Sequence, residues 1–336
     1  MNIVFRADAS VALGAGHVAR CLALADAGRA RGMVSRFICR ELEGNLIALI
    51  EARGYATDRL PASGPDEPRG SADWFVVDHY HLGATWEAAA RAAGGRVLAI
   101  DDLADRPHDC DVLLDQNLGR DGTAYAGLVP AACRILIGPS YSLLRPEFAE
   151  WRDRSLARRD ESHCRRLLIS MGGADQHNVT GAVLRALRNS SLPDDASLTV
   201  VMGSQAPWVE KVRDDAASMP WPTSVVSGAT NMAELMAASD LAIGAGGGTS
   251  WERCTLGLPA IVVILAANQA RGAKALDAAG AAIAVDNDQA MESALLAALA
   301  RCRDTGVLTG MSLAARRIAD GTGASRVVEA MIDVSR

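Results

Sequence analysis

The amino-acid sequence predicts an α/β protein made of two doubly wound domains, each with a parallel sheet. Three observations lead to this prediction. Short apolar segments alternate with helical segments in both halves of the chain, which is typical of βαβ units. Several apolar segments, such as "AIVVIL" at 260–265, lack polar alternation and suit strands covered on both faces. A charged segment near the middle interrupts the alternation and predicts a link between two domains.

The first half is expected to contribute one parallel sheet with helices between its strands. Helices are expected at 17–31 and 85–93, and the first ends at Gly32, a residue type common just after a helix. Strands are expected at 2–8, 36–40, 73–79, 96–102, 111–117 and 134–140.

The second half repeats the pattern after the charged segment. Strands are expected at 166–173, 197–203, 223–228, 241–248, 260–265 and 282–285, and helices at 178–189, 207–219, 231–239, 249–257 and 268–279. Three further helices are expected to finish the chain. The predicted organisation is a first domain at 1–147, a linker at 148–163 and a second domain at 164–336, with the domains facing each other across a cleft. Ligands of such sheets bind beyond the carboxyl ends of the strands.

Composition narrows the class of protein. The net charge of −6 and the lack of a basic run argue against nucleic-acid binding, which depends on clustered Lys and Arg. The seven cysteines form no CxxC pair, which favours reduced thiols in a cytoplasmic protein. Neither a signal peptide nor a run of 18 apolar residues is evident, so we expect no membrane span.

Two glycine-rich turns in the second half predict a diphosphate site. One is "GAGGGTSWER" at 244–253 and the other is "SMGGAD" at 170–175, and each directly follows an expected strand. Glycines at such a point let backbone N–H groups approach an anion. The alternative is a pair of tight turns that serve packing alone. The candidate nucleotide-binding residues are Gly172, Gly173, Gly246, Gly247, Gly248, Thr249 and Ser250.

Three further polar residues are expected near these turns. Glu252 lies one turn into the helix that follows the glycines, where a carboxylate can accept hydrogen bonds from two ribose hydroxyls; the alternative is an exposed helix acid. Asn268 and Gln269 end the next strand and are expected to point into the same region, or else to cap the following helix. Neither turn has the sequence of a Walker A loop or of a dinucleotide fingerprint.

The segment "GAGHVAR" at 14–20 places a histidine at a predicted helix start. The GxGxxA spacing of Gly14, Gly16 and Ala19 is a weak match to a dinucleotide fingerprint, but it does not follow its strand directly. The positive end of the helix dipole disfavours imidazolium, so His17 is expected to be a neutral general base. The alternative is a histidine bonded to backbone in a packed turn. Asp8, Gly16 and Arg20 complete this candidate substrate site.

The segment "VVDHYH" at 76–81 also ends a predicted strand. Asp78, His79 and His81 suggest metal ligands by residue type, but one loop cannot easily bring them to a common point. We therefore expect substrate contacts here, with Tyr80 as the best candidate, and no metal site.

Several of these motifs together resemble a known family. "FRADAS", "GAGHVARCLALA", "VVDHY", "IDDLADRPHDCDVLLDQN", "MGGADQHNVT" and "GAGGGTSWERCTLGLPAIVVILAANQ" are similar to segments of the pseudaminic acid pathway hydrolases, which act on UDP-2,4-diacetamido-2,4,6-trideoxy-β-L-altropyranose. The resemblance covers nearly the whole chain except the charged segment and the last helices. It implies a fold like that of GT-B glycosyltransferases of the MurG type, with UDP held by the second domain.

The resemblance also implies roles for individual residues. His17 would be the catalytic base, Glu252 and residues 246–250 would hold the nucleotide, and Tyr80 and Asn268 would line the sugar site. The implied reaction needs no metal or cofactor: water attacks the anomeric carbon with inversion and releases the free sugar and UDP. The alternatives are a UDP-sugar-dependent glycosyltransferase on the same fold, a non-catalytic nucleotide-sugar binding protein and, third, an NAD-dependent oxidoreductase.

Overall fold

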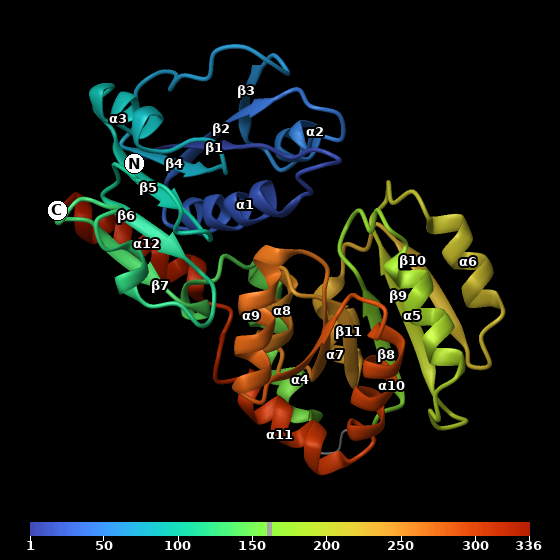
Figure 1. Ribbon diagram of the computed structural model, residues 1–336. Coiled ribbons are helices and arrows are strands. Elements are labelled where there is room, and N and C mark those ends of the chain that lie inside the picture. Colours follow the sequence, from blue (N-terminus) through green and yellow to red (C-terminus); the bar gives the residue numbers. More distant parts are fainter. Residues whose placement is uncertain (160–162) are drawn as a thin grey trace. The chain divides into compact units, whose positions relative to one another are not determined.

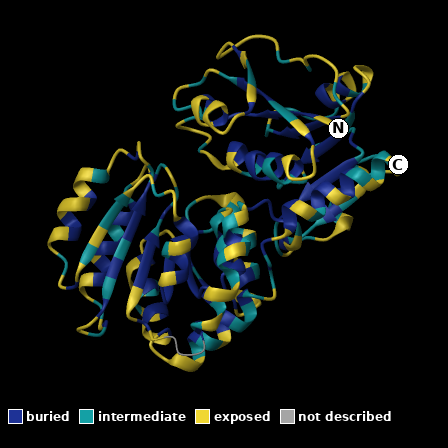
Figure 2. Cartoon of the chain, turned by 180° about the vertical axis from the view of Figure 1, so that it is seen from behind, coloured by how far each residue is buried: buried dark blue, intermediate teal, exposed yellow. Residues whose placement is uncertain are grey.

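The computed structural model describes residues 1–159 and 163–336, which form two compact α/β units (Figure 1). The first unit comprises Met1–Pro146 and Thr322–Arg336, and the second comprises Glu147–Gly321. In both units most strands are buried along most of their length, while most helices have one buried and one exposed face (Figure 2). The fold class expected from the sequence is therefore confirmed.

The first unit contains a parallel seven-stranded sheet in the order β3-β2-β1-β4-β5-β6-β7. Its strands are β1 (Asn2–Ala7), β2 (Val34–Arg40), β3 (Ala56–Leu60), β4 (Trp74–Asp78), β5 (Arg96–Ile100), β6 (Val112–Asp115) and β7 (Arg134–Ile137). Its helices are α1 (Gly16–Arg29), α2 (Ile47–Ala52), α3 (Ala84–Ala92) and α12 (Gly323–Ser335), with short 3-10 helices at Gly122–Tyr125 and Pro139–Tyr141.

Two apolar layers cover the sheet of the first unit. One contains α1, α2 and α12, whose buried residues pack on Phe5 and Phe37, two stacked rings with centroids 4.8 Å apart. The other contains α3, whose Trp86 packs at an angle against Phe75 of β4. The indole N–H of Trp74 donates to the hydroxyl of Ser335 at 3.0 Å, which joins the end of α12 to the start of β4.

The second unit contains a parallel six-stranded sheet in the order β10-β9-β8-β11-β12-β13. Its strands are β8 (Arg166–Ser170), β9 (Ser197–Met202), β10 (Thr223–Ser227), β11 (Leu241–Ala245), β12 (Ala260–Ile264) and β13 (Ala282–Asp286). Its helices are α4 (Pro146–Ala157), α5 (Val179–Arg188), α6 (Val209–Ala217), α7 (Met232–Ala238), α8 (Thr249–Thr255), α9 (Ala267–Ala278), α10 (Met291–Arg301) and α11 (Thr305–Ala315).

Most expected elements are present, and the differences have local causes. Strand β3, "ATDRL", and the six-residue helix α2 were not predicted, because β3 is a polar edge strand and α2 is too short to show periodicity. Most of the expected linker 148–163 is helix α4, whose Phe148 and Ser155 are buried. Residues 160–162 of the expected linker lie outside the described residues.

The chain end also differs from the expected second domain. Helix α12 belongs to the first unit, because its apolar face, with Val327, Val328 and Met331, packs in the same core as α1. The first unit therefore contains both ends of the chain. No helix in the described part of the chain is long and apolar enough to cross a membrane.

Candidate functional site

The strand order of the first unit reverses between β1 and β4, and His17 lies at this point. Helix α1 follows β1 and begins at Gly16, so the imidazole is in its first turn and is 7% exposed. Asp78 is the last residue of β4 and pairs in register with Ala7 of β1. The crevice where strand order reverses is the usual ligand site of an open parallel sheet. His17 therefore stands where a ligand is expected.

His17 forms a buried pair with Asp78. Nδ1 of His17 lies 2.6 Å from Oδ1 of Asp78, and the carboxylate is fully buried. We infer that Nδ1 carries the proton in this pair, since a carboxylate accepts hydrogen bonds. The other ring nitrogen, Nε2, makes no hydrogen bond to any described residue and is left as the basic atom.

Arg20 holds the same carboxylate from a second side. Its Nε donates to Oδ2 of Asp78 at 2.5 Å, and its Nη2 donates to Oδ1 at 2.5 Å. Burial acts to raise the pKa of Asp78, but Arg20 and His17 outweigh it and hold that pKa well below its usual range. The carboxylate is thus ionised and fixed. Arg20 therefore holds Asp78 in place, and its expected contact with substrate stays a prediction.

Two other expected substrate residues lie close by in different surroundings. The ring of Tyr80 stands edge-on to that of His17, with centroids 4.7 Å apart. Asp8 is 1% exposed and accepts hydrogen bonds from Arg6 and from the backbone N–H of Arg40, both at 2.7 Å. Tyr80 therefore borders the imidazole, while Asp8 joins the ends of β1 and β2.

The histidines after β4 do not converge with Asp78. Nε2 of His79 lies 3.3 Å from Oδ2 of Asp8, whereas Asp78 is paired with His17 and Arg20. Within the described ranges 1–159 and 163–336, no group of three or more His, Cys, Asp or Glu side chains is arranged to hold a metal ion.

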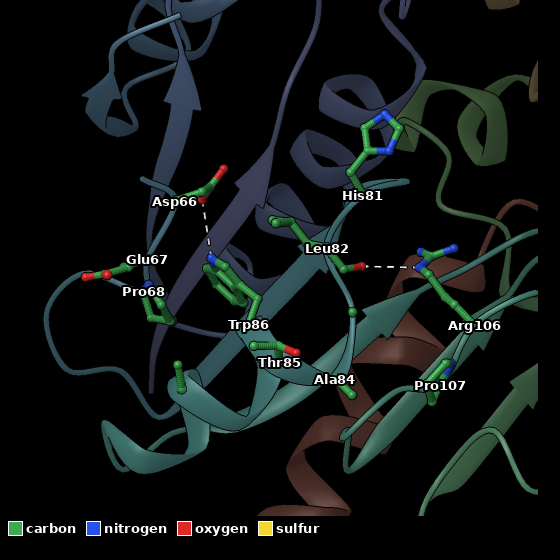
Figure 3. Close-up of a pocket in the computed structure, with 12 residues that line it drawn as sticks. Asp66, Glu67, Pro68, His81, Leu82, Ala84, Thr85, Trp86, Arg106 and Pro107 are labelled. Atoms are coloured by element: carbon green, nitrogen blue, oxygen red, sulfur yellow. Dashed lines mark hydrogen bonds between the residues drawn. The ribbon is translucent and has the colours of Figure 1, made fainter. Parts of the chain in front are cut away.

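A hollow of about 670 Å³ lies in the first unit beside this loop (Figure 3). Its lining includes Asp66, His81, Trp86 and Arg106. Asp66 accepts from Arg6 and from the indole N–H of Trp86, and Arg106 donates to the backbone carbonyls of Leu82 and His79 (Figure 3 shows the Trp86 and Leu82 bonds). These polar groups hold the surrounding loops together, so the hollow is a weaker candidate than the His17 site.

The second unit has its own reversal of strand order, between β8 and β11, and the two glycine turns follow these strands. The turns lie side by side because β8 and β11 are hydrogen-bonded neighbours. Gly172 has a φ of +91°, which favours glycine, and a Cβ on Gly203, just after β9, would collide with the carbonyl of Gly173. The glycines therefore let the 171–175 turn pass close to the backbone at Gly203.

The 246–250 turn has open space above two of its glycines, Gly247 and Gly248. A Cβ on Gly247 or Gly248 would meet no atom within 4 Å, and neither residue has a positive φ. Among the described residues, the backbone N–H groups of Gly247, Gly248 and Thr249 have no hydrogen-bond acceptor. Packing and backbone strain therefore do not explain Gly247 and Gly248, whereas the approach of a ligand to free N–H groups does.

The other expected residues differ in their exposure. Oε1 of Gln269 accepts hydrogen bonds from the N–H groups of Gly246, at 3.3 Å, and Leu265, at 3.1 Å, so this side chain supports the turn. Asn268 is exposed in the first turn of α9, and Glu252 is partly exposed in α8. Ser250 is 2% exposed and accepts from Arg253, so its hydroxyl faces the interior.

The start of α5, beside the 171–175 turn, is already capped. The carboxylate of Asp175 accepts from the N–H groups of Val179, at 2.8 Å, and Thr180, at 2.9 Å, and Asn178 accepts from Gly181. A carboxylate at this helix start disfavours a second anion there. The 246–250 turn is therefore the better of the two anion sites.

Comparison with known proteins identifies the family. The UDP-2,4-diacetamido-2,4,6-trideoxy-beta-L-altropyranose hydrolase of Campylobacter jejuni subsp. jejuni serotype O:2 is 30% identical over 219 residues, which cover 63% of this chain and 73% of the relative. The chain belongs to the family of this hydrolase. The family expected from the sequence motifs is thereby confirmed.

Two further similarities agree with membership of this family. Residues 167–320 match the glycosyltransferase family 28 C-terminal domain. The spore coat polysaccharide biosynthesis protein SpsG of Bacillus subtilis is 30% identical over 205 residues, which cover 60% of this chain and 59% of that relative.

The fold is also that of known GT-B proteins. The crystal structure of Acinetobacter baumannii MurG superposes with a TM-score of 0.70 over 99% of each chain, at 18% identity. At this identity the similarity establishes a shared fold. The GT-B-like architecture expected from the sequence is confirmed.

Sequence reasoning missed two residues that the structure brings to these sites. Asp78 was considered only as a metal ligand, although its position at a strand end was the available signal. Arg253 was not considered at all, because an arginine in a helix normally lies on the surface.

Proposed function

We propose that the protein hydrolyses UDP-2,4-diacetamido-2,4,6-trideoxy-β-L-altrose to the free sugar and UDP, as a step in pseudaminic acid biosynthesis. The observation that carries the proposal is the buried His17–Asp78 pair at the point where the strand order reverses. An oriented imidazole with one nitrogen available is the group needed to activate water. Family membership supplies the substrate class.

His17 acts as the general base in this proposal. Nε2 takes a proton from water while the water oxygen forms a bond to the anomeric carbon on the face opposite UDP. The bond from this carbon to the phosphate oxygen breaks, and UDP leaves with the electron pair. Asp78 stabilises the imidazolium that forms and keeps its own charge, as the low pKa of its carboxyl group requires. Attack from the opposite face inverts the anomeric centre.

The 246–250 turn holds the UDP portion. The N–H groups of Gly247, Gly248 and Thr249 face negative charge as it develops on the leaving group, where fixed donors lower the barrier most. Glu252 accepts from the ribose hydroxyls. Tyr80, beside His17, and Asn268, at the start of α9, contact the sugar.

The test is incubation of the purified protein with the UDP-sugar and no acceptor, followed by NMR. We expect release of UDP and of the free sugar. The sugar observed at early times should have the inverted anomeric configuration. The His17→Asn variant should lose turnover by roughly a hundredfold to ten-thousandfold, since general-base catalysis contributes that much. Its affinity for UDP should remain unchanged. Near-normal turnover in this variant would remove His17 from the mechanism.

A glycosyltransferase is the second candidate, and the match to the glycosyltransferase family 28 C-terminal domain favours it. It would use the same base to activate an acceptor hydroxyl in place of water. UDP release that requires an added acceptor alcohol would support this candidate and exclude the hydrolase. Tight UDP-sugar binding with no turnover under either condition would indicate a binding protein.

A further inference from the structure

Arg253 is a buried arginine behind the 246–250 turn. It belongs to α8 and is 3% exposed. Its Nη2 donates to the backbone carbonyl of Ala245 at 2.8 Å and to the hydroxyl of Ser250 at 2.9 Å. Ala245 ends β11 and Ser250 lies in the first turn of α8, so one guanidinium nitrogen ties together the two ends of the glycine turn.

The charge on this guanidinium has no counter-ion. In the described part of the chain, no carboxylate forms an ion pair with Arg253, although the charge of its chain neighbour Glu252 acts on it at longer range. Burial lowers the pKa of Arg253 to about 10, so the group still carries its charge at neutral pH. A buried charge without a partner costs free energy, and such groups are seldom retained for stability alone.

The neighbouring strand leaves room for this arginine. Gly244 of β11 has no positive φ, but a Cβ at this position would lie 2.5 Å from Nη1 of Arg253 and 2.7 Å from the carbonyl of Ser170. Glycine is therefore required at this position, because a larger residue would collide with the guanidinium and with the adjacent strand β8. The sequence of β11 thus accommodates a cation that the fold itself does not neutralise.

We propose that Arg253 is a positioning residue for the diphosphate, and that its buried charge is neutralised when the diphosphate binds at the glycine turn. The guanidinium fixes the ends of the turn so that the free N–H groups of residues 247–249 stay directed at the anion. Its positive charge lies behind the turn and adds to the partial positive charges of these N–H groups. This inference rests on the proposed function, because it takes the diphosphate of UDP as the anion.

Arg159 provides a matched control. It is 2% exposed, and burial lowers its pKa to about 9. It bonds the backbone carbonyls of Ser239 and Met236. These residues precede β11, whereas the glycine turn follows it, so Arg159 is equally buried at the opposite end of the same strand.

The experiment compares UDP with uridine, which lacks the phosphates, by calorimetry on Arg253→Met, Arg159→Met and the unchanged protein. Arg253→Met should weaken UDP binding at least tenfold and leave uridine binding unchanged. Its thermal midpoint without ligand should stay the same or rise, while the stabilisation by UDP should shrink. Arg159→Met should leave the ratio of UDP to uridine affinity unchanged.

Other results would overturn the inference. A folded Arg253→Met protein with normal UDP affinity would do so, as would an equal loss of UDP and uridine affinity, which indicates a structural role only. If Arg253→Met does not fold, Arg253→Lys and Arg253→Gln replace it, and only the lysine variant should keep the preference for UDP. Hydrolysis by the unchanged protein is measured in a separate assay. If this protein binds UDP but does not hydrolyse the UDP-sugar, the proposed function is contradicted, whereas the inference about Arg253 is not.

Discussion

The Nδ1 atom of His17 and the Oδ1 atom of Asp78 are 2.6 Å apart, although the two residues are 61 positions apart in the chain. The carboxylate is fully buried and is also held by two nitrogens of Arg20. The three side chains therefore form one charge system in which Arg20 compensates Asp78. The first two predictions follow from this arrangement.

Asp78→Asn should lower kcat by roughly a hundredfold or more, because an amide no longer fixes the proton on Nδ1 or stabilises the imidazolium. UDP affinity should not change, since Asp78 belongs to the first unit and the glycine turn to the second. Asp102→Asn is the control: Asp102 lies 3.5 Å from Arg20 and does not touch His17. A similar loss of kcat in both variants would contradict a specific role for the pair.

Arg20→Gln should lower kcat by roughly tenfold or more, because the carboxylate of Asp78 loses the two guanidinium hydrogen bonds that hold it against Nδ1 of His17. Arg20→Lys keeps the positive charge but cannot make the same pair of bonds, so it should recover only part of the activity. Steady-state kinetics with the UDP-sugar measures both variants, and an unchanged kcat in Arg20→Gln would contradict a positioning role for Arg20.

Gly247→Ala and Gly248→Ala should weaken UDP binding at least tenfold, or about 1.4 kcal/mol, and leave stability unchanged within about 0.5 kcal/mol. The added methyl group meets open space in the free protein but occupies the path of the ligand. Calorimetry with UDP and thermal unfolding measure the two effects. Gly310→Ala in α11 is the control, because its Cβ also meets nothing within 4 Å. Unchanged UDP affinity in both test variants would place the anion elsewhere.

The first unit should lose stability between pH 6.5 and pH 9 through His108. Burial opposes the charge on this side chain, but Asp101 and Glu87 outweigh it and raise the pKa of His108 to about 9. A pKa raised on folding stabilises the protein fully below the unfolded value of 6.5, and this contribution is lost as pH rises through 9. The expected loss is about 3 kcal/mol, from 1.36 kcal/mol for each pKa unit.

Urea titrations at pH 6, 7.5 and 9 would measure this loss. The His108→Gln variant should show a flatter dependence on pH, whereas His81→Gln, at an exposed position of the same unit, should behave like the unchanged protein. An equally steep dependence in the His108 variant would assign the effect to another group.

The sequence by itself determined the α/β class, most strands and helices, and the three segments that contain the candidate site residues. Alternating apolar and helical segments, the glycines at 246–248 and His17 before a helix are local features, and local features can be read along the chain. The elements it did not reveal are those with little local signal, such as the polar edge strand β3 and the short helix α2.

The tertiary structure alone decided which side chains meet. Pairing of β1 with β4 brings Asp78 to His17 and to Arg20. Pairing of β1 with β2 places Asp8 beside the backbone N–H of Arg40. The packing of α12 on α1 assigns the chain end to the first unit. These outcomes depend on strand order and helix packing, which arise from contacts between distant residues and leave no periodic pattern in the sequence.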